Sequence, residues 1–590
     1  MEYSIITDTY AKIEATSKRL EMTEYLVQLL KRTPTDLIKK VAYLTQGKLY
    51  PDFVGIELGM AEKMVISAIA RTMGLSRQKV RQVYNTTGDL GSAIEVLKTT
   101  TPTSRLMAST NISVTKVYEV LDRIAHTTGK GSVEAKINLL TRLITDSTPE
   151  EAKYLIRTIT GRLRLGIGDM TFLDALAIAF GGGKEARQDV EKAYNMSSDL
   201  GSVAETIATL GVEGILSYRV QLGHPIRPML AERLTSASEV LDKLGGQGSA
   251  EYKYDGLRIQ AHISPDDIVL FSRRMENITS QFPDVARALR NSLHALDAII
   301  EGEAVAVDPN TNEILPFQVI TRRRGRKHNI NEMIEEIPIT LILFDALYMN
   351  GQSLLDNPYS TRRAYLEKAI TETERVKITQ PLLVTSPQLL DEYMMEAIEN
   401  GCEGLVIKSV TQEAKYQAGA RGFLWIKYKR DYRSELSDTL DLVAVGAFAG
   451  RGRRTGTFGA LLMAAYNNEK DIFETVCKLG TGFTDEVLSQ LPHIFRDAQI
   501  TQVHPRVESK IEAQYWFIPQ NVLEIRGAEL TLSPSHTCGI DIIGKDTGLA
   551  IRFPRFTGKW RHDKAPQDTT TVREIVSMYQ AQLKTAETTR

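Results

Sequence analysis

Lys253-Tyr254-Asp255-Gly256-Leu257-Arg258 combines an amine, an acid-glycine pair and a guanidinium in one short stretch. A lysine amine has a reference pKa of roughly 10.4 and is almost fully protonated at neutral pH, so it is ordinarily not a nucleophile. Nearby positive charge and desolvation lower that pKa, and an amine beside an arginine and a bound metal can become reactive. Gly256 would let the backbone turn close to a ligand. The stretch predicts a nucleophilic lysine, although most lysines in such short patterns are solvated surface groups.

Acidic and basic candidates follow downstream. Arg273, in Ser272-Arg273-Arg274, can bind a ribose hydroxyl or a phosphate, or can belong to a surface turn. Glu301-Gly302-Glu303 is expected to end an apolar strand, and Glu403 is expected to begin another. Carboxylates at strand ends beside a cleft can hold Mg²⁺ through one or two direct contacts. Surface acids are commoner than metal ligands, so these residues are candidates only in combination with the lysine.

Two further segments offer an aromatic face and a pair of cations. Phe344-Asp345-Ala346-Leu347-Tyr348 is expected to close a very apolar strand, with Phe344 facing a base or filling the core. In Trp425-Ile426-Lys427-Tyr428-Lys429, the alternation places Lys427 and Lys429 on one strand face and the packed residues on the other. Each lysine is a candidate phosphate ligand, or an edge lysine that resists aggregation.

The predicted secondary structure changes twice along the chain. Residues 1–224 have apolar positions at helical spacing, and Tyr194-Asn195 with Asp199-Leu200-Gly201-Ser202 repeats an earlier Tyr84-Asn85 with Asp89-Leu90-Gly91-Ser92. This echo predicts two diverged helical units of about 110 residues each. A shared helix cap is the alternative interpretation, and both can hold because a repeated cap implies a repeated unit. Residues 225–430 alternate short β-rich runs with helices and predict an α+β domain. Residues 431–590 predict a small all-β barrel with a C-terminal helix.

Composition sets limits on the class of protein. The 590 residues are expected to form about three or four domains, at roughly 150 residues each. A hydrophobic share of 42%, no apolar run of membrane length and no signal-like N-terminus predict a protein of the cytoplasm without a membrane segment. Cys402, Cys477 and Cys538 are too few for a four-cysteine zinc site. The net charge of −1 does not indicate a nucleic-acid binder, but phosphate contacts depend on local patches.

Taken together and in order, these motifs resemble the signature of covalent nucleotidyltransferases, the superfamily of ATP-dependent ligases and messenger-RNA capping enzymes. The match extends to both flanks. The helical region, the segment Pro225-Ile226-Arg227-Pro228-Met229-Leu230-Ala231 and the basic ending from Arg552 to Lys564 are similar to replicative ATP-dependent DNA ligases, particularly the archaeal type. The resemblance covers essentially the whole chain. It implies an all-α DNA-binding domain, an α+β nucleotidyltransferase (adenylation) domain and a C-terminal OB-fold barrel.

The resemblance also implies a chemistry. Lys253 would attack the α-phosphate of ATP and carry AMP, which would pass to the 5′-phosphate at a nick before the 3′-hydroxyl displaces it. Mg²⁺ (or Mn²⁺) would be held by Glu303 and Glu403, while Arg258, Lys408 and Lys427 would offset growing phosphate charge. The residues expected to contact the nucleotide are Glu251, Arg258, Arg273, Glu303, Phe344, Arg421 and Lys427. Asp255, Gly256 and Lys429 complete these motifs. The partner would be nicked double-stranded DNA, bound by a monomer at the nucleoid.

Several basic segments are candidates for DNA contact. The run from Arg322 to Lys327 and the loop Arg451-Gly452-Arg453-Arg454 could bind phosphates or could simply be solubilising. The basic ending, with Arg555, Arg561, Asp563 and Lys564 as its motif residues, would contact phosphates or orient the pyrophosphate leaving group. Binding to a sliding clamp is in doubt, because residues 101–111 have no aromatic residue where related enzymes often carry a double-phenylalanine segment.

Three other functions fit part of the pattern. RNA capping or RNA ligation shares the lysine motif but does not need a large helical domain. An NAD-dependent ligase typically carries a four-cysteine zinc module that three cysteines cannot supply. A DNA-binding scaffold that has lost activity would be expected to lack at least one of Lys253, Glu303, Lys408 and Lys427, all of which are present.

Overall fold

The computed structural model describes most of the chain. The described residues are 1–100, 111–307, 314, 317–323, 330–400, 402–429, 439–450, 456–527, 529–533, 535–543, 546–552 and 554–587. The basic loop 451–454, residues 324–327 of the basic run and residues 101–110 of the stretch considered for clamp binding lie outside them. Two compact units are present: Met1–Val83 with Leu90–Lys429, and Tyr84–Asp89 with Arg430–Arg590.

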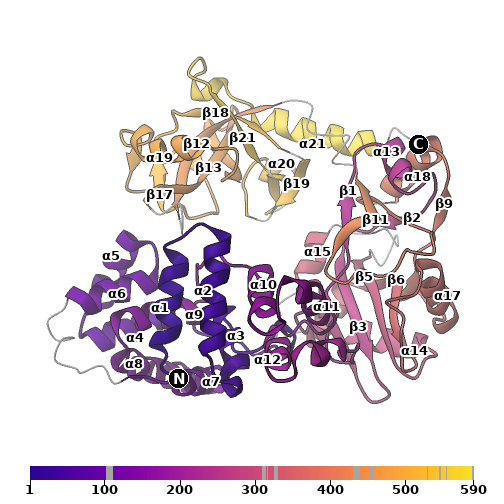
Figure 1. Cartoon of the computed structure of the whole chain (residues 1–590). Coiled ribbons are helices and arrows are strands. Elements are labelled where there is room, and N and C mark those ends of the chain that lie inside the picture. Colours follow the sequence, from indigo (N-terminus) through magenta and orange to yellow (C-terminus); the bar gives the residue numbers. More distant parts are fainter. Residues whose placement is uncertain are drawn as a thin grey trace. The chain divides into compact units, whose positions relative to one another are not determined.

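The N-terminal part is helical, as predicted, and its helices form two similar sets (Figure 1). The first set is α1 (Ser4–Glu14), α2 (Arg19–Arg32), α3 (Ile38–Thr45), α4 (Glu62–Met73), α5 (Arg77–Thr87) and α6 (Leu90–Thr100). The second is α7 (Val114–His126), α8 (Ser132–Asp146), α9 (Pro149–Ile159), α10 (Asp169–Phe180), α11 (Arg187–Ser197) and α12 (Leu200–Leu216). Each helix of the first set has a counterpart in the second about 110 residues later.

The two helical sets interlock rather than stand apart. Helix α4 packs on α8 and α10 packs on α2, while α6 packs on α9 and α12 packs on α3. A side chain at Gly91 would come within 2.6 Å of the Lys153 carbonyl oxygen, and one at Gly201 would overlap the ring of Tyr43. The Asp199 carboxylate caps α12 by accepting from the Ser202 amide at 2.9 Å. The repeated motif is therefore both a helix cap and a point of close helix crossing.

The middle of the chain forms two sheets. The first has the order β1 (Leu230–Arg233), β11 (Arg421–Lys429), β10 (Gly404–Lys408), β2 (Gly248–Lys253) and β9 (Leu382–Val384). The second has the order β4 (Ile268–Ser272), β3 (Leu257–Ile263), β5 (Ala298–Ala306), β6 (Ile339–Met349) and β7 (Gln352–Ser353), with β8 (Val376–Ile378) paired to β6. Helices α13 (Ala237–Lys243) and α18 (Pro387–Glu399) pack on the first sheet. Helices α14 (Pro283–Ser292) and α17 (Tyr359–Ala369) pack on the second.

Two strand boundaries predicted from the sequence are wrong. Strand β5 continues to Ala306, so Glu303 lies inside the strand and not at its end. Strand β6 continues to Met349, so Phe344 lies near the middle of the strand. Both strands are buried over most of their length, and an apolar run read from the sequence ends where the first polar side chain appears rather than where the backbone pairing ends.

The C-terminal part contains a curled sheet. Strand β12 (Leu440–Ala449) pairs along one edge with β13 (Phe458–Asn467) and along the other with β18 (Val522–Arg526) and β17 (Tyr515–Phe517). The remaining strands are β14 (Ile472–Leu479), β15 (Gln499–Ile500), β16 (Val507–Glu508), β19 (Glu529–Ser533), β20 (Gly548–Arg552) and β21 (Arg555–Trp560). Helices α19 (Asp485–Ile494) and α21 (Val572–Glu587) contribute to its apolar core.

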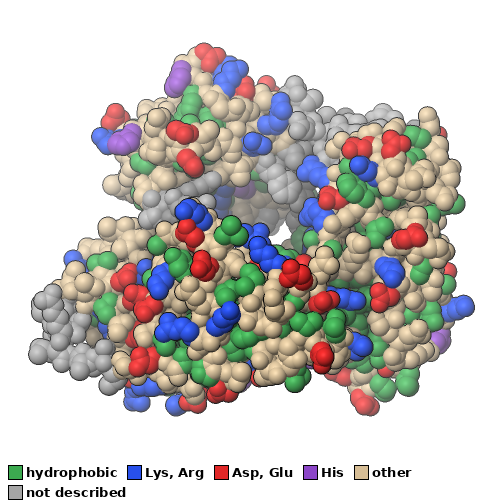
Figure 2. All heavy atoms as spheres, in the orientation of Figure 1, with side chains coloured by type: hydrophobic (Ala, Val, Ile, Leu, Met, Phe, Trp, Pro, Cys, Tyr) green, Lys and Arg blue, Asp and Glu red, His purple; other side chains and the backbone are tan. Residues whose placement is uncertain are grey.

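Neither sign of charge dominates the visible surface of the helical part (Figure 2). On the face seen in Figure 2, Lys and Arg side chains are interspersed with Asp and Glu over the helical part. Across the described ranges, every helix is too short or too polar to serve as a membrane span. Cys402, Cys477 and Cys538 are all buried and unpaired with one another.

Candidate active site

Lys253 lies at the end of β2, beside one acid and one further lysine. Strand β10 runs between β2 and β11, and Gly404 is opposite both Lys253 and Lys429. The Glu403 amide donates to the Lys253 carbonyl oxygen at 2.8 Å, and the Glu403 carboxylate forms ion pairs with the amines of Lys253 and Lys429, the latter at 2.6 Å. Burial would raise the pKa of Glu403, but these two cations outweigh it and hold the pKa at about 2.

Strands β3 and β5 bring a second acid to the same place. Arg258 is paired with Glu303 across the two strands. Burial is the main cause that raises the pKa of Glu303 to about 7. Lys253 and Arg258 oppose the rise, and the negative charges of Glu403 and Asp255 add to it. Three carboxylates therefore interact around the Lys253 amine.

Gly256 is required by packing against β5. A side chain there would overlap the Ala304 carbonyl oxygen and would come within 2.9 Å of Glu303 Cγ. The backbone at Gly256 therefore approaches the neighbouring strand closely, and its expected approach to a ligand stays a prediction. Glycine here lets the turn between β2 and β3 lie directly against the strand that carries Glu303.

Glu303 and Glu403 are suited to bind a divalent metal ion whose remaining ligands come from a bound substrate. Within the described ranges, no group of three or more His, Cys, Asp and Glu side chains has the arrangement of a metal site. Mg²⁺ is commonly bound by one or two carboxylates together with substrate phosphates, and does not need an all-protein cage. Glu303 and Glu403 fit this binding mode, because the negative charge of Glu403 raises the pKa of Glu303 and a bound cation would offset that repulsion.

Four cations surround Lys427. Burial lowers the pKa of Lys427, and Arg421, Lys429, Arg273 and Lys253 lower it further. Arg273 and Arg421 are exposed, whereas the two β11 lysines are half-buried on the face opposite Tyr428, as the alternation predicted. Like charges gathered at this density repel one another, so the arrangement favours binding of a polyanion.

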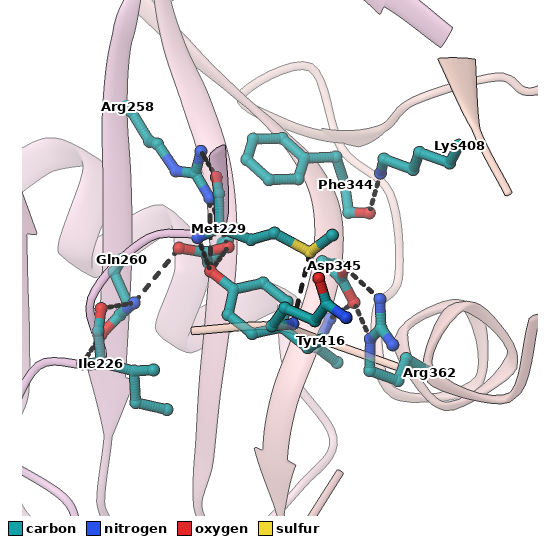
Figure 3. Close-up of polar contacts among 12 residues, drawn as sticks. Ile226, Met229, Arg258, Gln260, Phe344, Asp345, Arg362, Lys408 and Tyr416 are labelled. Carbon is teal, nitrogen blue, oxygen red and sulfur yellow. Dashed lines mark hydrogen bonds and ion pairs between the residues drawn. The ribbon is translucent and has the colours of Figure 1, made fainter. Parts of the chain in front are cut away.

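Phe344 lies between two cations (Figure 3). The Arg258 guanidinium carbon is 5.2 Å from the Phe344 ring centroid, and Lys408 Nζ is 5.1 Å from it. The Phe344 ring also meets Trp425 edge-on at 6.2 Å. The ring is half-buried, which leaves part of its surface available for stacking.

Glu251 and Lys408 form a buried pair. They are 2% and 1% exposed, and the Lys408 amine lies 2.9 Å from a Glu251 carboxylate oxygen and donates to the Phe344 carbonyl oxygen at 2.9 Å. The hydroxyls of Tyr359 and Thr379 also donate to Glu251. The structure thus places Lys408 beneath Phe344, away from the exposed cations around Lys427.

Three parts of the chain each match the model of a known protein family. The model described as "DNA ligase N terminus" matches residues 2–177, "ATP dependent DNA ligase domain" matches residues 228–429, and "ATP dependent DNA ligase C terminal region" matches residues 454–564. The chain belongs to the ATP-dependent DNA ligase family. The resemblance inferred from the motifs is therefore confirmed, and the family has a three-domain architecture and uses ATP.

Relatives that match along nearly the whole chain are named DNA ligases. "DNA ligase 2" of Thermofilum pendens is 50% identical over 593 residues, covering 99% of this chain and 98% of the relative. The "DNA ligase" of Staphylothermus marinus is 48% identical over 595 residues, covering 99% of both chains. A solved structure named "Pmar-Lig_Pre." is 15% identical and covers 94% of this chain and 99% of its own, with a TM-score of 0.56, which supports the fold alone.

The C-terminal ligase motif is held by an acid of its own domain. The Asp441 carboxylate is 2.7 Å from Arg561 and 2.7 Å from Lys564, and Arg561 also pairs with Asp563 at 2.7 Å. Arg555 is exposed on β21. In the structure the basic ending is thus balanced by acids, which the sequence did not predict.

Sequence reasoning missed three ligase residues next to the site. Gln260, Glu301 and Tyr416 are buried and hydrogen-bonded to one another or to Arg258. The sequence signal for these residues was Glu301, an acid inside an apolar run. Because a buried carboxylate needs a partner, its position indicated that other polar residues lie nearby.

Proposed function

We propose that this DNA ligase seals nicks in duplex DNA through a covalent intermediate on Lys253. The observation that supports this most is the position of the Lys253 amine, which lies among Glu403, Glu303 and the cations around Lys427. When a polyanion and a cation bind, the cation can take over the carboxylate partner of the lysine. The amine then loses its ion pair and can react.

In the first step the Lys253 amine, after losing a proton, forms a bond from Nζ to the α-phosphorus of ATP. The bond from that phosphorus to the bridging oxygen breaks, and pyrophosphate leaves. Arg273, Arg421 and Lys427 are the residues we assign to the phosphates and ribose, since they form the exposed cationic rim. Phe344 and Arg258 are assigned to the base and its neighbouring sugar. The buried pair of Glu251 and Lys408 would form the bottom of this nucleotide site. Positioning and charge neutralisation carry such a transfer.

Glu303 and Glu403 would hold Mg²⁺ (or Mn²⁺), which supplies charge neutralisation for the triphosphate. Their own contribution is to bring two carboxylates to the same side of Lys253. Asp255 remains on the adjoining turn, where its carboxylate accepts from the Phe317 amide at 3.2 Å.

In the remaining steps AMP passes to the 5′-phosphate at the nick, and the nitrogen–phosphorus bond breaks as Lys253 regains a proton. The 3′-hydroxyl then attacks the activated 5′-phosphorus, a phosphodiester bond forms and AMP leaves. Arg561 and Lys564 are assigned to the pyrophosphate end of ATP in the first step, with Asp563 and Arg555 as the rest of that motif.

We also infer the division of labour among the domains. Residues 1–224 would bind duplex DNA, residues 225–430 would carry out adenylyl transfer, and residues 431–590 would form an OB-fold. The substrate would be nicked double-stranded DNA in the cytoplasm, bound by a monomer. Binding to a sliding clamp would need a surface other than residues 101–110.

The test is transfer of α-labelled nucleotide to the protein, followed by sealing of a nicked duplex. Label from ATP is expected on the denatured protein, and the nick is expected to close with Mg²⁺ present. Label from GTP in place of ATP would indicate a capping reaction and would contradict the proposal.

A further inference from the structure

Gln260 on β3 binds the backbone of the segment 223–229 that follows the helical part (Figure 3). Its Nε2 donates to the Ile226 carbonyl oxygen at 2.9 Å, and its Oε1 accepts from the Ile226 amide at 2.7 Å. The same Nε2 donates to Glu301 Oε1 at 3.2 Å. One buried side-chain amide, 5% exposed, therefore connects the segment to a buried carboxylate.

Tyr416 makes a parallel connection three residues further along the segment. Its hydroxyl accepts from the Met229 amide at 2.9 Å and donates to Glu301 Oε2 at 2.9 Å. The Tyr416 ring is 5% exposed and packs edge-on to Trp425 at 5.9 Å. Its position is thus fixed from both sides.

Glu301, which accepts from Gln260 and Tyr416, also binds Arg258. The Arg258 guanidinium donates to Glu301 Oε2 at 2.7 Å, and Glu301 is 1% exposed. A buried carboxylate that loses a donor is strongly destabilised, so its geometry is set by the groups that bind it. Because Arg258 lies against Phe344 and opposite Glu303, a shift of Glu301 would move a side chain of the proposed nucleotide site.

His262 fixes which way the Gln260 amide points. Its Nδ1 accepts from the Gly223 amide at 3.0 Å, so the ring hydrogen is on Nε2 and donates to Gln260 Oε1 at 2.9 Å. Burial lowers the pKa of His262 to about 3 and keeps the ring neutral. The Gln260 Nε2 group is consequently left to face Glu301.

The other side of the same segment is held by the helical part. The Arg227 guanidinium is 3.1 Å from the Asp169 carboxylate and 4.5 Å from the Tyr194 ring centroid, and the Arg227 amide donates to the Asn195 carbonyl oxygen at 2.8 Å. Contacts therefore run from the helical part through the segment to Glu301 and Arg258.

We infer that Gln260 and Tyr416 are positioning residues for adenylyl transfer, acting through Glu301 to hold Arg258 against bound ATP. Alignment of Arg258 then depends on docking of the segment 223–229. The inference rests on the proposed function, because it assigns Arg258 to the nucleotide. A network that served folding alone would change stability but not the affinity for ATP.

The main experiment compares Tyr416→Phe with the unaltered full-length chain in the rate of lysyl-AMP formation against ATP concentration. Tyr416→Phe keeps the ring and removes only the hydroxyl that joins Met229 to Glu301. The KM for ATP is expected to rise about tenfold, with most of the maximal rate retained, because the loss falls on one hydrogen bond to a charged group. Gln260→Met is a second variant and is expected to raise the KM in the same way.

The matched control is Tyr393→Phe. Tyr393 is 8% exposed in the same unit, and its hydroxyl donates to the Gln380 carbonyl oxygen at 2.9 Å without any link to Arg258. Its substitution is expected to leave the KM for ATP unchanged while costing a similar amount of stability.

A double-mutant cycle tests whether Tyr416 acts through Arg258. In an Arg258→Lys background, Tyr416→Phe is expected to raise the KM much less than it does alone. A normal KM in both Tyr416→Phe and Gln260→Met, or a full additional effect in the Arg258→Lys background, would overturn the inference. Failure of the unaltered chain to form lysyl-AMP would instead overturn the proposed function.

Discussion

Glu403 immediately precedes β10 and contacts Lys253 twice: its amide donates to the Lys253 carbonyl oxygen at 2.8 Å, and its carboxylate is paired with the Lys253 amine. The proposed nucleophile is therefore held in an ion pair with a carboxylate. The same carboxylate can bind a divalent cation once ATP brings one. In the proposed reaction, exchange of Glu403 between the amine and a cation would connect ATP binding with release of the nucleophile.

Glu403→Gln is expected to raise the Mg²⁺ concentration needed for half-maximal lysyl-AMP formation by about tenfold or more, since an amide is a poorer Mg²⁺ ligand than a carboxylate. Titration of Mg²⁺ at saturating ATP measures this. The control is Glu396→Gln, an exposed acid on α18. An unchanged Mg²⁺ requirement would remove Glu403 from the metal site.

The raised pKa of Glu303 predicts a pH dependence of metal binding. Because this pKa is about 7, the side chain is mostly protonated below pH 7 and binds a cation poorly there. Affinity for Mn²⁺, measured by electron paramagnetic resonance without ATP, is expected to increase between about pH 6 and pH 8. Glu303→Gln is expected to weaken binding and flatten this increase. A curve of the same shape in the variant would contradict the assignment.

Lys427→Ala is expected to slow lysyl-AMP formation more than sealing of a nick that already carries AMP. The reason is that Lys427 lies among cations facing the proposed triphosphate, and pyrophosphate has left before sealing. Single-turnover assays of the two steps provide the comparison. Equal losses in both steps would count against placing Lys427 on the triphosphate.

Gly256→Ala is expected to destabilise the unit that contains β3 and β5. The new methyl group would overlap the Ala304 carbonyl oxygen, and overpacking of this kind typically costs about 1–3 kcal/mol. Denaturant unfolding measures the change. Gly168→Ala serves for comparison, because no atom lies within 4 Å of the added methyl group. Equal free energies of unfolding for the two variants would contradict this prediction, because β5 would then have moved to accommodate the methyl group at little cost.

Much of the fold followed from periodicity and repetition in the sequence. The repeated motif was visible in the sequence, and both of its copies place a glycine, Gly91 or Gly201, at a close helix contact. The ends of β5 and β6 were not predictable, because strands buried on both faces give no alternation to mark where pairing stops. The order of motifs along the chain also does not reveal that the Lys408 amine lies against the Phe344 ring and donates to its carbonyl oxygen.

The candidate site was predictable where its chemistry is local in sequence, as in the stretch from Lys253 to Arg258. It was not predictable where partners are distant. Glu301 and Tyr416 are 115 residues apart, and neither carries a pattern that points to the other. Asp441 and Arg561, 120 residues apart, are a second such pair. Tertiary contacts of this kind depend on strand order, which local propensity does not specify.

The most direct measurement is intact-mass analysis of the full chain mixed with ATP and Mg²⁺, followed by mapping of the modified peptide. A gain of one adenylyl group at Lys253 is expected, and none is expected for Lys253→Ala, which should still bind nicked duplex DNA. An adduct at a different residue, or no adduct on the unaltered chain, would contradict the account.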